Sequence, residues 1–175
     1  IVLAHLWREA PALATLFARI ALITNLKLNQ PKCLIIPLWR TVHLELRALV
    51  REYISIWADF SIGKCGKYLG FYVGPGGHEK SWEAPTVKYE ETCNVLATHG
   101  GSFGNAISLY RYLALPNLMY VAQLFPPTKE ALIAERRGLL RIAAGPGNWV
   151  PMEVLTNLDL FGFPFRVPDL SGAAT

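Results

Sequence analysis

Two stretches of the chain carry apolar residues with the period of an α-helix. Between residues 11 and 24 the apolar side chains recur at i, i+3, i+4, i+7 and i+10: Leu13, Leu16, Phe17, Ile20 and Ile23. Between residues 46 and 57 a second stripe lies opposite a polar side: Leu46, Leu49, Val50, Tyr53, Ile54 and Trp57. A stripe of this kind is the side of a helix that faces a core. We therefore predict two amphipathic helices in the first part of the chain.

Three short apolar runs in the same part of the chain have the character of β-strands. They cover residues 1–4, 32–36 and 67–73. The second run stops at Pro37, because proline cannot donate to a central ladder. The third is rich in aromatic and β-branched residues and is followed by Gly-Pro-Gly-Gly at 74–77, which favours a tight turn. We predict that the three runs form a short, mainly antiparallel sheet packed on the two helices.

The sequence after residue 77 has an almost wholly helical pattern. One helix is predicted from about residue 81 to 98, and another starts at Pro126-Pro127-Thr128 and stops at Gly145-Pro146-Gly147. Residues 105–124 are apolar nearly all round, with Pro116 in the middle. Because proline kinks or breaks a helix interior, we expect either one kinked helix here or two helices that meet.

The order of these elements predicts an α+β fold. A sheet and two helices occupy residues 1–77, and a helical region occupies residues 78–150. Residues 151–175 are predicted to hold one short helix and a loose tail of small residues.

Composition narrows the class of protein. Hydrophobic residues make up 52% of the 175 residues, charged residues only 17%, and the mean hydropathy is +0.27. This balance predicts apolar surface that another segment or molecule covers. Charges such as Arg8, Arg19 and Lys27 interrupt the most apolar region, so no run reaches the roughly 18 residues of a membrane span. With no leader pattern and three widely spaced cysteines, we expect an intracellular protein of the nucleus or cytoplasm without a membrane partner.

Acidic residues are too dispersed for a catalytic metal centre. A two-metal site for nucleotidyl transfer needs carboxylates that share cations about 3.5–4 Å apart. The three aspartates, Asp59, Asp159 and Asp169, are isolated from one another in the sequence. The four histidines share no i, i+4 spacing and lie apart from the cysteines, which disfavours zinc. We predict no metal site and no cofactor for this chain.

Basic and aromatic residues offer a candidate nucleic-acid-binding surface on a chain of net charge +4. The candidates are Lys67, Tyr68, Arg111, Arg136, Arg137 and Arg141. Arg137 and Arg141 lie one helical turn apart, and the planar fork of arginine suits phosphate. The alternative interpretation is an ordinary solvated helix face beside a half-buried aromatic strand.

The succession of two motifs resembles a known protein family. Residues 25–37 have the sequence Asn-Leu-Lys-Leu-Asn-Gln-Pro-Lys-Cys-Leu-Ile-Ile-Pro, and residues 67–74 have Lys-Tyr-Leu-Gly-Phe-Tyr-Val-Gly. This order resembles the late palm region of non-LTR (LINE-type) retroelement reverse transcriptases, in which a similar Leu-Lys-Leu-Asn segment precedes a Lys-Tyr-Leu-Gly strand. The resemblance implies that Lys32 matches the late-palm lysine that is proposed to assist departure of pyrophosphate. It also implies a strand that grips the primer end, matched by Tyr68, Leu69 and Gly70.

By this resemblance the chain is the C-terminal part of a polymerase palm, residues 1–77, followed by a helical thumb-like region. The implied partners are a duplex of RNA template and DNA primer, and the fingers and N-terminal palm of the parent enzyme. The family's Tyr-Ala-Asp-Asp motif is absent from the sequence, so magnesium is expected only in the complete parent. We therefore expect this chain not to extend a primer by itself, because paired carboxylates are needed to clamp the attacking and leaving oxygens.

Two alternatives to a polymerase piece stay open at this point. One is a non-enzymatic helical module whose apolar surface docks another protein, and the other is a decayed retroelement relic without activity. Duplex binding that weakens steeply with salt favours the polymerase piece, because neutralised phosphates release counterions. Salt-insensitive self-association favours the interaction module.

Overall fold

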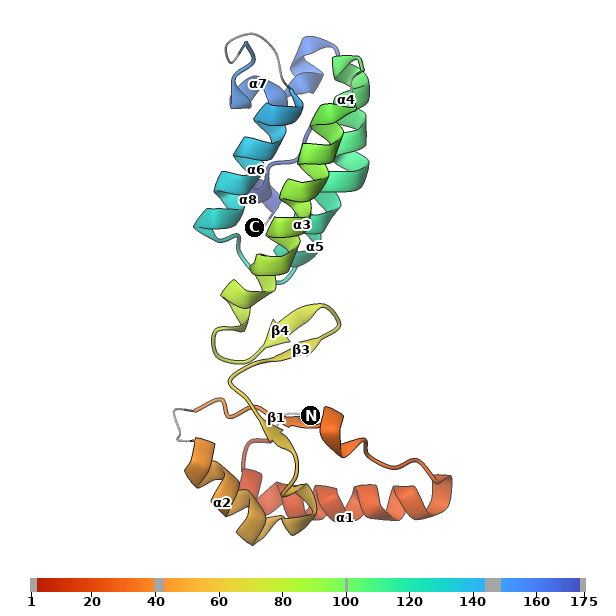
Figure 1. Cartoon of the computed structure of the whole chain (residues 1–175), viewed down its shortest axis with the longest axis vertical. Helices are drawn as coiled ribbons and strands as arrows, with labels where there is room; N and C mark the ends of the chain where they lie inside the picture. The colour runs from red at the N-terminus through yellow and green to blue at the C-terminus, as the bar shows by residue number, and fades with distance from the viewer. Residues whose placement is uncertain (1–2, 40–42, 100, 144–148, 174–175) are drawn as a thin grey trace. The chain divides into compact units, whose positions relative to one another are not determined.

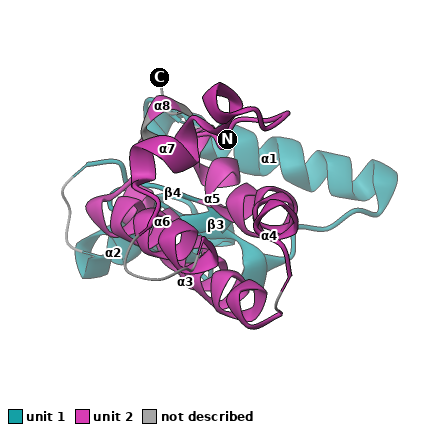
Figure 2. Ribbon diagram, turned by 90° about the horizontal axis from the view of Figure 1, so that it is seen from above, with its two compact units in different colours: residues 1–68, 72–76 teal, residues 69–71, 77–175 magenta. Residues whose placement is uncertain are grey.

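The computed structural model describes residues 3–39, 43–99, 101–143 and 149–173. The chain divides into two compact units, which are coloured separately in Figure 2. Unit 1 comprises residues 1–68 and 72–76, and unit 2 comprises residues 69–71 and 77–175. Each unit has its own cluster of buried apolar residues.

In its described residues, unit 1 is built from two helices, short 3₁₀ turns and very short strands (Figure 1). In chain order they are α1 (Leu6–Thr24), η1 (Gln30–Lys32), β1 (Leu34–Ile35), α2 (His43–Tyr53), η2 (Ser55–Trp57) and β2 (Ser61–Ile62). Strand β1 pairs with β2 in parallel, with Leu34 opposite Ser61 and Ile35 opposite Ile62. The predicted strand at 32–36 is therefore shorter than expected, because residues 30–32 form the 3₁₀ turn.

The buried side of α1 differs from the predicted stripe. The helix buries Ala10 and Ala14, which pack with Leu46 and Val50 of α2. Leu16, Ile20 and Ile23 of the predicted stripe are exposed, whereas Leu13 and Phe17 are partly buried. The buried side of α1 is therefore the side of its small alanines and not the side of its large apolar residues. On α2 the prediction holds better, since Leu46 and Val50 are both on the predicted stripe.

The run at 67–73 is not one strand but a hairpin. Strand β3 (Gly66–Tyr68) pairs with β4 (Phe71–Val73) across the two-residue turn of Leu69 and Gly70. Both turn residues have positive φ, 48° and 92°, as the tight type I′ turns of hairpins require. The predicted single sheet is thus two separate two-stranded sheets, β1–β2 and β3–β4.

The first predicted strand, residues 1–4, is not formed where the structure describes it. Residues 1 and 2 lie outside the described residues, and residues 3–5 are irregular before α1 begins at Leu6. The α+β class itself is confirmed, with short sheets followed by a helical region.

Unit 2 is helical. Its elements are α3 (Gly77–Thr98), α4 (Phe103–Leu109), the π-helical turn η3 (Tyr110–Ala114), α5 (Leu115–Ala122), α6 (Lys129–Ile142), α7 (Met152–Thr156), the 3₁₀ turn η4 (Leu158–Phe161) and α8 (Leu170–Ala173). The π-helical turn immediately precedes α5, whose first turn contains Pro116 and so tolerates the missing N–H. Thr128 caps α6, since its Oγ1 accepts a hydrogen bond from the Ala131 N–H.

The core of unit 2 lies between α3, α5 and α6. Its largest buried side chains on these helices and the π-helical turn include Trp82, Tyr89 and Tyr110. The close approach of α6 to α3 depends on Gly138, because a Cβ there would lie 2.5 Å from Tyr89 Oη.

The segment from residue 151 to Leu170 is part of the core of unit 2, and the small-residue end that the sequence predicts to be loose follows it. It contributes four buried residues to the core of unit 2: Leu155, Leu158, Val167 and Leu170. Apolar residues spaced widely along an irregular segment give no periodic signal, which is why the sequence did not indicate this packing. Among the described residues, none of the helices combines the length and the apolar character that crossing a bilayer requires.

Candidate nucleic-acid interface

The Lys67–Gly70 segment forms the exposed tip of the β3–β4 hairpin. Lys67 and Tyr68 end β3, and Tyr68 is 68% exposed. Leu69, the first turn residue, is 73% exposed. An exposed leucine with positive φ is unusual, since only glycine, asparagine and aspartate adopt this region readily. The tip therefore presents a cation, an aromatic ring and an apolar side chain to solvent.

Tyr120 of α5 holds the turn within unit 2. Its hydroxyl donates a 2.5 Å hydrogen bond to the Leu69 carbonyl oxygen. Its ring stacks on Phe71, with the ring centroids 4.6 Å apart. A Cβ at Gly70 would lie 3.1 Å from the Tyr120 ring, and Gly70 has a φ of 92°, so a larger residue there would be strained. No sequence pattern indicated Tyr120, because it lies in a helix that is apolar nearly all round.

Hydrogen bonds join the start of α3 to the segment that precedes α6. The backbone oxygen of Pro126 accepts hydrogen bonds from the Trp82 indole N–H at 3.0 Å and from His78 Nε2 at 2.8 Å. The His78 ring also lies against Phe125, with the ring centroids 5.6 Å apart. These contacts give Trp82, His78 and the Phe125-Pro126 segment a structural role.

The three arginines of α6 differ in their surroundings. Arg136 and Arg137 are exposed. Arg141, one turn beyond Arg137, donates from Nη1 to Asn94 Oδ1 of α3. Its guanidinium is therefore partly engaged in joining two helices, and Arg136 and Arg137 are the better candidates for an external anion.

Two other predicted residues belong to other elements. Arg111 belongs to the π-helical turn η3, and its guanidinium carbon lies 4.8 Å from the centre of the Phe165 ring. This cation–π contact ties Arg111 to the C-terminal segment of unit 2. Lys32 is exposed at the end of η1 in unit 1. The candidates thus belong to four elements: the hairpin tip, the exposed face of α6, the π-helical turn η3 with Arg111, and η1 with Lys32.

A polar cluster inside unit 2 joins α3, α6 and the C-terminal segment. The Tyr89 hydroxyl donates to the Glu135 carbonyl oxygen at 3.0 Å and lies 3.3 Å from the Tyr110 hydroxyl. Glu135 Oε1 accepts a 2.9 Å hydrogen bond from the Leu170 N–H. Burial raises the pKa values of the Tyr89 and Tyr110 hydroxyls, and raises that of the Cys93 thiol to about 11. These groups are therefore uncharged at neutral pH and serve packing.

The pKa of Glu135 is raised to about 7, because burial outweighs the lowering effect of the hydrogen bond from the Leu170 N–H, and the Asp169 carboxylate adds a smaller increase. The sequence pattern did not indicate this, because a glutamate next to two arginines is typical of a solvated helix face. The position is nevertheless buried, since α8 covers it.

Within the part of the chain that the structure describes, no three histidine, cysteine, aspartate or glutamate side chains gather closely enough to hold a metal ion. Comparison with known proteins yields no match to a protein-family model, to a curated protein or to a solved structure.

Proposed function

We propose that this chain is the nucleic-acid-holding part of a retroelement-type reverse transcriptase. The observation that carries the proposal is the exposed Lys67–Gly70 tip, supported from within unit 2 by Tyr120. The tip is the segment whose sequence resembles the family's primer-gripping strand. Its chemistry suits the task, since an exposed ring stacks on a base and a neighbouring cation attracts phosphate.

The exposed face of α6 is the second contact of the proposal. Arg136 and Arg137 present guanidinium groups to solvent, and such groups bind phosphate oxygens in pairs. Arg111 and Arg141 have partners of their own, Phe165 and Asn94, and contribute to this surface less. The proposal therefore assigns phosphate contact to Arg136 and Arg137, and primer contact to the hairpin tip. The wider assignment, to an RNA-directed DNA polymerase that uses magnesium elsewhere in the parent enzyme, follows from the sequence resemblance alone.

The test is binding of a labelled RNA–DNA primer–template duplex to the purified chain, followed by fluorescence anisotropy between roughly 50 and 200 mM salt. We expect affinity to fall steeply with salt. Arg137→Glu and Lys67→Glu should each weaken binding and lower the salt slope by about 1, as loss of one phosphate contact does.

The matched control is Lys88→Glu, the same charge reversal at an exposed position of α3. A general effect of net charge predicts equal losses for Lys88→Glu and Arg137→Glu, and equal losses would refute the assigned contacts. Duplex affinity that does not change with salt would refute the proposal as a whole.

A second candidate function is favoured by one observation, the exposed apolar side of α1. Leu16, Ile20 and Ile23 lie on one stripe of this helix and are exposed. Contiguous apolar surface marks sites of protein–protein contact. Under this interpretation the chain is a helical interaction module that docks through α1.

A further inference from the structure

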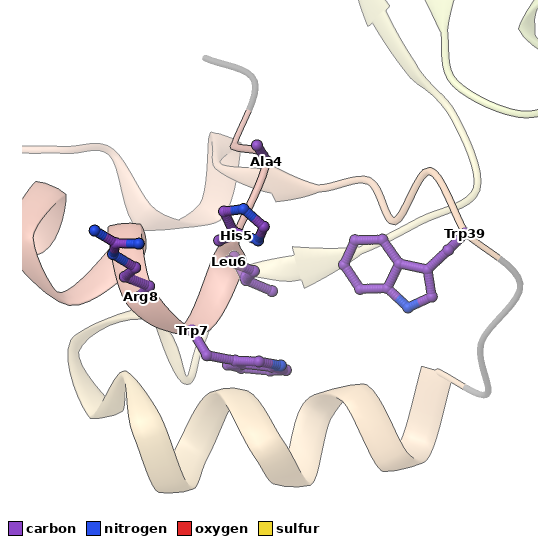
Figure 3. A pocket seen from close by; sticks show the side chains of 6 residues that line it. All are labelled: Ala4, His5, Leu6, Trp7, Arg8 and Trp39. Atoms are coloured by element: carbon purple, nitrogen blue, oxygen red, sulfur yellow. The ribbon is translucent and has the colours of Figure 1, made fainter.

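A hollow of about 580 Å³ opens beside the start of α1 in unit 1 (Figure 3). It is lined by Ala4, His5, Leu6, Trp7, Arg8 and Trp39. Its volume lies within the range of about 300–1,000 Å³ that is usual for small-molecule sites. All six residues precede the hairpin in the chain, and none of them is among the candidate residues described above.

Two tryptophans of the hollow are open to solvent. Trp39 is 50% exposed and Trp7 is 36% exposed. Trp7 is held in place by Tyr53 of α2, with the ring centroids 5.5 Å apart. Figure 3 shows the Trp39 indole standing free across the hollow from His5 and Leu6. Tryptophan buries a large area when it is covered, so a pair left open beside a hollow is typical of a binding surface.

The polar residues of the hollow are basic. His5 and Arg8 are both exposed, and none of the six lining residues is acidic. The nearest carboxylate along the chain is that of Glu9. Its Oε2 already accepts a hydrogen bond from the Ala4 N–H at 3.2 Å. In Figure 3 Arg8 lies on the other side of the α1 start from Trp39. A ligand that contacts both Trp39 and Arg8 therefore needs a flat apolar group and, separated from it, an anionic group.

We infer that this hollow binds a nucleotide, with the base against Trp39 and its phosphate toward His5. Every base has a face that stacks on an aromatic ring, and the phosphate supplies the negative charge that the basic rim attracts. An apolar peptide would cover the tryptophans but leave the basic rim without a partner. The separation of Arg8 from Trp39 favours a nucleotide within a single strand, in which a neighbouring phosphate reaches Arg8.

This inference goes beyond the proposed duplex contacts, since it concerns other residues and another ligand. The probe is a short fluorescent oligothymidylate, whose binding to the full chain is measured by anisotropy at low salt. Trp39→Ala should weaken binding at least about fivefold, because stacking contributes about 1–3 kcal/mol per base. Trp39→Phe should keep most of the affinity, since the ring remains. Arg8→Gln should lower the salt slope by about 1.

Leu38→Ala is the control, because Leu38 is the exposed neighbour of Trp39 in the chain and does not line the hollow. Competition by free thymidine monophosphate indicates a site for a free nucleotide, whereas competition by unlabelled strand alone indicates a site for a strand. Either result supports the inference. Absence of binding, or equal affinity of the wild type and a folded Trp39→Ala variant, overturns it. Because the probe lacks a duplex, this failure is distinct from failure of the contacts assigned to α6 and the hairpin.

Discussion

Burial of a single carboxyl group couples the folding of unit 2 to pH. Glu135 is only 3% exposed, and its Oε1 accepts the Leu170 N–H at the start of α8. Burial raises its pKa from 4.5 to about 7. Between pH 4.5 and pH 7 the Glu135 carboxyl is mostly ionised in the unfolded chain and mostly protonated in the folded chain. The contribution of Glu135 to stability is therefore greatest below about pH 4.5 and is lost as pH rises to about 7.

Glu135→Gln should remove this dependence, because glutamine stays neutral and keeps a side-chain oxygen for the Leu170 N–H. Between pH 5 and pH 8 the free energy of unfolding of the wild type should fall by on the order of 2 kcal/mol relative to that of the variant. Urea unfolding followed by circular dichroism at both pH values measures this fall. Glu83→Gln, at an exposed position of α3, is the control, and the wild type should show little fall relative to it. A difference between wild type and Glu135→Gln that is the same at both pH values would contradict the prediction.

At the scale of elements, α1 shows that periodicity alone does not determine which side of a helix is buried. Its apolar stripe runs through Leu16, Ile20 and Ile23, but its buried residues are Ala10 and Ala14, which belong to the same core cluster as Leu46 and Val50 of α2. These two alanines are four residues apart and so form a patch of small side chains on one side of the helix. The larger side chains flank this patch and are left partly or wholly exposed.

Substitutions on the two sides of α1 test whether its alanine side or its predicted apolar stripe is buried. Ala10→Leu should lower the free energy of unfolding by about 1–3 kcal/mol, because Ala10 is fully buried and the added atoms have no space. Leu16→Ala should change it by no more than about 0.5 kcal/mol, since Leu16 is exposed. Chemical denaturation of both variants measures the two effects. A larger loss for Leu16→Ala than for Ala10→Leu would mean that the predicted stripe is the buried side.

At the scale of the whole molecule, the apolar composition is divided between two separate cores and an exposed remainder. One core lies in unit 1 and the other in unit 2. The remainder includes the exposed side of α1 and the apolar residues that follow it, Leu26 and Leu28. The two cores therefore do not bury all of the hydrophobic residues in the sequence.

We expect this exposed surface to cause self-association as concentration rises. Because burial of apolar surface drives it, raising the salt concentration should not dissociate the assembly. Sedimentation velocity at low and high salt measures both effects. Leu16→Glu should restore the monomer, whereas Thr15→Glu, at the neighbouring exposed position away from the stripe, should not. A chain that stays monomeric at every concentration would remove the support for the interaction module.

The helical unit was more predictable from sequence than the strand-containing unit. Helix α6 begins after Thr128, as the preceding prolines and the threonine cap indicate, because caps and periodicity depend on neighbours within one or two turns. Strand pairing depends on residues far apart in the chain. The pairing of β1 with β2, and the division of the 67–73 run into two strands, therefore had no local signal strong enough to predict them.

The candidate site was predictable in the same uneven way. Sequence alone determined the basic run on α6, the Lys-Tyr-Leu-Gly motif and the α+β class, since each depends on residue type and spacing. Only the tertiary structure decided that Tyr120 supports the turn and that Arg111 and Arg141 are engaged by Phe165 and Asn94. It also decided which side of α1 is buried and that Glu135 is enclosed. Each of these outcomes depends on contacts between segments distant in sequence, and periodicity along one segment carries no information about its partner.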